Sequence, residues 1–68
     1  MSMRILGIDP GFGRVGWGVV EKKGGHFLHI AHGCISTSPK ASFAKRLSVI
    51  AEELDGLCQK YSPRVMGV

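Results

Sequence analysis

The chain has few acidic residues, few aromatic residues and only two cysteines. Its 68 residues include 5 aspartates and glutamates against 9 lysines and arginines, with a single tryptophan and a single tyrosine. Cys34 and Cys58 lack the spacing of a zinc site and fall at apolar positions of a predicted strand and a predicted helix. This pattern predicts reduced core cysteines in a protein of the cytoplasm.

Long apolar segments are also missing. No run approaches the ~20 residues that a membrane-spanning helix needs, and too few apolar residues precede Asp9 for a signal peptide. We therefore expect a soluble cytoplasmic protein without a membrane partner. The length allows one domain at most, with a thin core, because a chain this short buries only about 60% of its unfolded surface.

Basic residues and glycines are plentiful. The net charge of +4 suits a polyanionic partner without requiring one, since the basic residues are scattered along the chain. Ten glycines are present, and glycine in a strand often marks the close approach of another backbone or of a ligand. Six lie in or beside predicted strands and turns: Gly7, Gly11, Gly13, Gly16, Gly18 and Gly67.

Asp9 is the candidate functional residue that the sequence singles out. It follows a short apolar run and precedes Pro10 and Gly11, which predicts a carboxylate where a buried strand gives way to a turn. A carboxylate held beside bare backbone can bind a divalent cation and let a phosphate approach. The alternative is that Asp-Pro-Gly forms a turn and nothing more.

The first half of the chain predicts three antiparallel strands. Residues 3–8 are apolar nearly throughout, which favours a strand buried on both faces, and a turn over 9–14 follows. Residues 15–22 and 26–36 alternate as strands around a hairpin turn at 23–25. Trp17 and Phe27 are expected in the core. His26, His29 and His32 recur every three residues, so on a regular strand they alternate faces and do not converge on a metal.

The second half predicts a helix and one more strand. Apolar residues from Phe43 to Tyr61 recur on one helical face, with Ser38 as the expected cap and Pro39 at the first helical position. Ser62-Pro63 ends the helix. Lys45 and Arg46 are expected to contribute to a DNA-facing surface or to lie on a solvated flank of the helix. Residues 65–68 begin a fourth strand, expected to lie parallel beside the first.

Four segments together resemble the N-terminal part of the RuvC Holliday-junction resolvases. They are Ile-Leu-Gly-Ile-Asp-Pro-Gly at 5–11, Gly-Arg-Val-Gly-Trp-Gly-Val-Val at 13–20, Gly-Cys-Ile at 33–35 and Lys-Arg-Leu at 45–47. The resemblance covers essentially the whole chain. It implies an α/β, RNase H-like fold, of which residues 1–68 form the N-terminal part of a single nuclease domain whose remainder lies outside this chain.

The same resemblance implies a function. Such enzymes are metal-dependent endonucleases that act as homodimers and place paired cuts across a four-way DNA junction in recombination and repair, in company with a branch-migration helicase. Four acidic residues hold the metal, Mg²⁺ or Mn²⁺, and Asp9 matches the first. In relatives the second directly follows the fourth strand.

The remaining acids restrict what this chain can do alone. None is well placed to share a metal with Asp9, because one lies at the far end of the second strand and the others lie on the helix: Glu21, Glu52, Glu53 and Asp55. Since two-metal phosphodiester hydrolysis needs several converging carboxylates, we expect the 68-residue chain by itself not to cut DNA.

The turn after Asp9 is the expected nucleic-acid contact. Gly11 and Gly13 are expected either to let a phosphate approach or to form a plain hairpin turn. Phe12 is expected either to lie against a nucleotide or to cover the sheet edge. Arg14 is expected either to touch a phosphate or to be solvated. Two other functions stay open. Actin-like ATPases and sugar kinases open with a similar strand and turn but carry hydroxyl residues in it, and a non-catalytic RNase H-like module would bind nucleic acid without cutting it.

Overall fold

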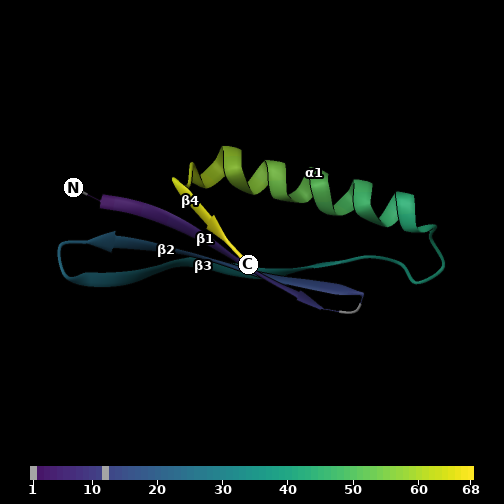
Figure 1. The fold of residues 1–68 in the computed structure, drawn as a ribbon, viewed down its shortest axis with the longest axis horizontal. Coiled ribbons are helices and arrows are strands. Elements are labelled where there is room, and N and C mark those ends of the chain that lie inside the picture. Colours follow the sequence, from purple (N-terminus) through teal and green to yellow (C-terminus); the bar gives the residue numbers. More distant parts are fainter. Residues whose placement is uncertain (1, 12) are drawn as a thin grey trace.

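The computed structural model describes residues 2–11 and 13–68, which form a four-stranded sheet and one helix (Figure 1). The elements are β1 (Ser2–Gly11), β2 (Arg14–Lys23), β3 (His26–Ser36), α1 (Phe43–Tyr61) and β4 (Val65–Gly67). The strand order is β3-β2-β1-β4, with β1, β2 and β3 antiparallel and β4 parallel to β1. The predicted order of elements and the parallel fourth strand are confirmed, as expected for the N-terminal part of an RNase H-like sheet.

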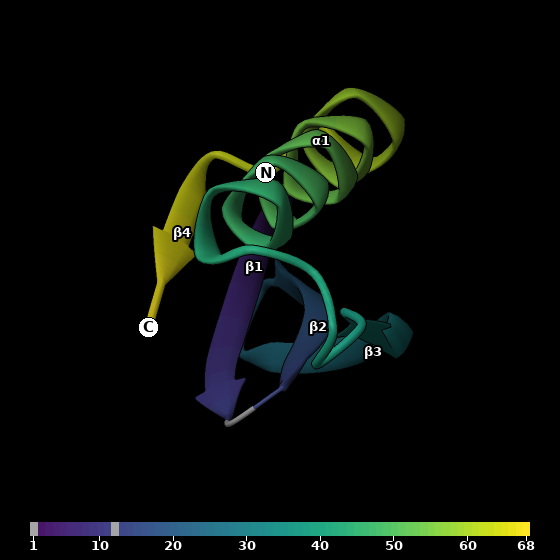
Figure 2. The ribbon, with the colours of Figure 1, turned by 90° about the vertical axis from the view of Figure 1, so that its right-hand side faces the viewer.

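The helix lies on one side of the three long strands (Figure 2), and the buried residues lie on that face. Leu6, Val15, Val19 and Ile35 form this core. The register places them together, because Leu6 pairs with Val19 and Val15 pairs with Ile35. At the end of α1 the Tyr61 ring lies 6.1 Å from the Trp17 ring, centroid to centroid.

The core is thinner and more one-sided than the sequence indicates. α1 has no buried residue, and Phe43 at its start is 75% exposed. The prediction that the first strand is buried on both faces is wrong, because only Leu6 of β1 is buried. Phe27 and Cys34 are exposed rather than in the core, while Trp17 is half-buried. Within residues 2–11 and 13–68, nothing covers the sheet face opposite α1 (Figure 2), so side chains pointing that way stay exposed.

β1 extends further than predicted. It continues through Pro10 to Gly11, so Asp9 lies inside a paired strand, opposite Gly16, and not in the turn. β4 pairs with β1 only at positions 5–7, which leaves the last residues of β1 at a sheet edge on that side. Proline, which has no N–H to donate to a ladder, is tolerated at such an edge.

The helix starts later than predicted. Ser42 is the N-cap and its hydroxyl accepts a hydrogen bond from the Lys45 amide at 3.1 Å. Ser38 instead accepts from the Lys40 amide at 3.2 Å, so the residues around Pro39 form a turn before the helix. The predicted end is confirmed: Ser62 has a positive φ of 49° and its amide donates to the Cys58 carbonyl at 2.9 Å. No helix in the described ranges has the length and apolar character needed to cross a membrane.

A β-bulge interrupts the pairing of β2 with β3. Val19 faces Ala31 and Val20 faces His29, which leaves Ile30 as the extra residue. The bulge inverts the alternation on β3, so His29 and His32 come to the same face. Their ring nitrogens, Nε2 and Nδ1, lie 2.9 Å apart. The prediction that His29 and His32 alternate faces is therefore wrong, because it assumed a regular strand.

Candidate active site

Asp9 lies exposed on the open face, which we define as the sheet face opposite α1. Side chains alternate along a strand, so Asp9 points away from the core that Leu6 enters. It pairs with Gly16, where an added Cβ would lie 3.8 Å from the Asp9 Cβ. The hydrogen bonds and ion pairs found among the described residues leave the Asp9 carboxylate without a partner.

Glycines surround this carboxylate. Gly7 precedes it on β1, and Gly16 and Gly18 follow one another along the same face of β2. A shallow cavity of about 410 Å³ lies here, lined by Gly7, Ile8, Asp9, Gly16, Trp17, Gly18 and Gly33. Because no side chain rises from the three glycines beside Asp9, a flat or extended ligand can approach the backbone closely.

The residues described here do not make up a complete metal site. No group of three or more histidine, cysteine, aspartate or glutamate side chains gathers within residues 2–11 and 13–68. Glu21 lies 3.7 Å from Arg4 Nε on the covered face, and Asp55 accepts a hydrogen bond from Gln59 on the helix. A protein usually holds Mg²⁺ through one or two carboxylates together with waters and substrate phosphates, and Asp9 supplies one.

The predicted nucleic-acid contacts lie at the same end of β1 and β2 as Asp9. Gly13 has a φ of +75°, which an L side chain rarely adopts, and its carbonyl accepts a hydrogen bond from the Thr37 amide at 3.3 Å. At Gly11 a Cβ would lie 2.7 Å from the Arg14 carbonyl oxygen, so this turn requires glycine. Arg14 is exposed, and Phe12 lies outside the described residues.

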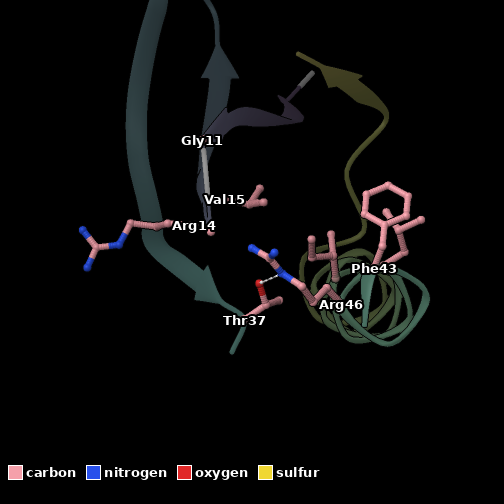
Figure 3. Close-up of a pocket in the computed structure, with 9 residues that line it drawn as sticks. Gly11, Arg14, Val15, Thr37, Phe43 and Arg46 are labelled. Atoms are coloured by element: carbon pink, nitrogen blue, oxygen red, sulfur yellow. Dashed lines mark hydrogen bonds between the residues drawn. The ribbon is translucent and has the colours of Figure 1, made fainter. Parts of the chain in front are cut away.

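A second cavity, of about 250 Å³, separates this turn from the start of α1. Arg46 reaches across it from α1 and its Nε donates a hydrogen bond to Thr37 Oγ1 at 3.0 Å, while the Arg14 side chain points away from the cavity (Figure 3). The sequence indicated Arg46 as a surface residue and did not indicate Thr37. No spacing rule links two residues on either side of a turn, so only the folded chain reveals this contact.

Comparison with known proteins identifies the family. The family model for the crossover junction endodeoxyribonuclease RuvC matches residues 5–68. The chain is similar to curated proteins of that name: 52% identical over 61 residues to one from Thermosipho melanesiensis (90% of this chain, 39% of the relative). It is 46% identical over 66 residues to one from Hyphomonas neptunium (97% and 40%), and 38% identical over 68 residues to one from Borrelia turicatae (100% and 42%). The chain thus spans about two fifths of the length of these relatives.

Proposed function

The chain belongs to the RuvC family of crossover junction endodeoxyribonucleases, and on that premise we propose that it contributes the first part of a nuclease domain that cuts four-way DNA junctions. Its role is to present Asp9 as a metal-binding, catalytic carboxylate on a face open to DNA. The family match favours this function over the actin-like ATPase and sugar-kinase alternative and over a non-catalytic module.

The position of Asp9 relative to β4 carries the proposal. β1 and β4 run parallel with Gly7 opposite Gly67, so Ile8 faces position 68 and Asp9 faces position 69 if the pairing continues. Paired residues of neighbouring strands lie about 4.8 Å apart and point to the same face. An acid directly after the fourth strand, as the family resemblance implies, would therefore stand beside Asp9.

Two adjacent carboxylates on a glycine-lined face suit a hard divalent cation such as Mg²⁺ or Mn²⁺. A cation held there would supply activation of the attacking water and stabilisation of the leaving oxygen in phosphodiester hydrolysis. Asp9 would bind this cation and fix its position. Gly7, Gly16 and Gly18 carry no side chains, so the scissile phosphate can approach the backbone beside Asp9. Gly11, Gly13 and Arg14 border the same end of the sheet and contact the flanking DNA backbone.

The partners follow from the reaction. Two symmetric cuts across a junction require two copies of the site, which supports a homodimer. The proposal also includes a branch-migration helicase as partner and the bacterial cytoplasm, where the chromosome lies, as the location.

Cleavage of a synthetic four-way junction by a polypeptide that continues beyond Val68 tests the proposal. Asp9→Asn keeps the size of the side chain but removes its charge, and we expect it to lower Mg²⁺-dependent cleavage at least about 100-fold because charge stabilisation by a bound metal is worth several kcal/mol. Asp55→Asn, on the solvated side of α1, is the matched control and should cut normally. Wild-type rates for Asp9→Asn would overturn the assignment, and Asp9-dependent cleavage by residues 1–68 alone would show that further acids are not required.

A further inference from the structure

The open face carries a second group of metal-ligating side chains, on β3. The Nε2 atom of His29 and the Nδ1 atom of His32 lie 2.9 Å apart, with ring centroids 5.0 Å apart and planes inclined by 51°. Both residues are exposed. Strand residues three apart normally point to opposite faces, and the bulge at Ile30 is what brings these two together.

A nitrogen–nitrogen distance of 2.9 Å is that of a hydrogen bond between the two rings. In the neutral pair one imidazole nitrogen carries the proton and donates it to the lone pair of the other. A metal ion can replace that proton, since two neutral imidazole nitrogens are common ligands for transition metals. The two rings already lie close enough together for both nitrogens to bind one ion.

The distance between the nitrogens corresponds to a definite angle between two metal ligands. At a metal–nitrogen distance of about 2.0–2.1 Å, two nitrogens 2.9 Å apart subtend an angle of about 90° at the metal. That is the angle between adjacent ligands in square-planar and octahedral coordination, which Cu²⁺ and Ni²⁺ adopt. A tetrahedral Zn²⁺ site would need the nitrogens roughly 3.3–3.4 Å apart at the same bond length.

We propose that His29 and His32 form a two-histidine site for Ni²⁺ or Cu²⁺, with water completing the coordination. The site is separate from Asp9. His32 pairs with Gly18, and Gly18 pairs with Gly7, so the two sites are two strands and two residues apart, roughly 10 Å or more at sheet spacings. The donors also differ, because imidazole selects transition metals whereas a carboxylate suits Mg²⁺.

Calorimetric titration with Ni²⁺ tests the site in the 68-residue chain and in any longer polypeptide that contains it. Ni²⁺ is the better probe because Cu²⁺ oxidises thiols and Cys34 is exposed on the same face. We expect one ion per chain, bound more tightly than Zn²⁺. His29→Asn and His32→Asn should each weaken binding at least about tenfold, the loss that removal even of an outer-shell partner can cause.

His26→Asn is the matched control, since His26 lies on the same strand three residues before His29 and pairs with Lys23. It should leave the Ni²⁺ affinity unchanged. Equal losses in all three variants, an unchanged affinity in His29→Asn, or tighter binding of Zn²⁺ than of Ni²⁺ would each overturn the proposal. If a variant does not fold, Ni²⁺ added to the wild-type chain should broaden the imidazole NMR signals of His29 and His32 before that of His26, and the reverse order would count against it.

Discussion

The two faces of the sheet are made by the same strands but have opposite requirements. The face under α1 holds every buried side chain among the described residues: Leu6, Val15, Val19 and Ile35. The alternate residues of the same strands point to the open face. This face carries Asp9, the His29–His32 pair and the three glycines beside Asp9 on β1 and β2. Strand alternation thus separates residues that stabilise the fold from residues available for chemistry.

The difference predicts how each face responds to substitution. On the covered face a side chain cannot be lost without leaving a cavity, whereas on the open face a side chain cannot be gained beside Asp9 without blocking access to it. Variants that remove a side chain from one face or add a side chain to the other test this contrast.

Loss of a buried side chain should have the largest effect. Leu6 is fully buried, and Leu6→Ala should lower the free energy of unfolding by about 2–5 kcal/mol, enough to unfold a chain with so thin a core. Urea denaturation followed by circular dichroism measures the change. Ile5→Ala, on the open face of the same strand and half-exposed, is the control and should cost clearly less. Equal losses at the two positions would show that the open face is covered in solution.

Addition of a side chain beside Asp9 should affect activity rather than stability. Valine at position 16 suits a strand, but its methyl groups would rise next to the Asp9 carboxylate. In a polypeptide that cuts junctions, Gly16→Val should therefore slow cleavage about 100-fold by displacing the phosphate and leave the melting temperature unchanged. Val20→Ile is the control, because it enlarges a residue on the same face of β2 that lies opposite Ile5 and away from Asp9. Normal cleavage by Gly16→Val would mean that the substrate does not cross this face.

A glycine on the covered face should tolerate substitution less well than one on the open face. A Cβ at Gly33 would lie 2.9 Å from Trp17 Cζ2, so Gly33→Ala forces the indole away from Tyr61. Such overpacking typically costs about 1–3 kcal/mol. At Gly18 the nearest atom to a Cβ is the Ala31 carbonyl oxygen at 3.9 Å, an ordinary contact. Thermal unfolding should show a smaller loss for Gly18→Ala, and a reversed order would contradict the assignment of the faces.

The smallest effect is expected on α1. Gly56 is exposed, with open space around a Cβ, so Gly56→Ala should raise the free energy of unfolding by about 0.5–1 kcal/mol through helix propensity alone. Gly24→Ala is the control, because its φ of +61° makes any side chain strained there. Chemical denaturation should show a higher free energy of unfolding for Gly56→Ala and a lower one for Gly24→Ala. A loss at Gly56 would indicate that this side of α1 contacts another part of the protein.

Periodicity predicted most of the architecture, because it records which elements form and which face of each is apolar. The bounds of β3 and the end of α1 at Ser62 were predicted correctly. The start of α1 was not, since Ser38 and Ser42 can both cap a helix and only the turn around Pro39 selects between them. Asp9 was predicted as a candidate residue, but its place inside a paired strand depends on how far β1 stays paired with β2.

The sequence by itself determined the order of strands and helix, the parallel return of β4 and the choice of Asp9, because local alternation, turn residues and family motifs are read along one dimension. The tertiary structure decided which residues share a face. A single extra residue at Ile30 inverts the alternation on β3 and joins His29 to His32, and the register of β4 determines what stands beside Asp9. Register is a relation between strands, so no single strand contains it.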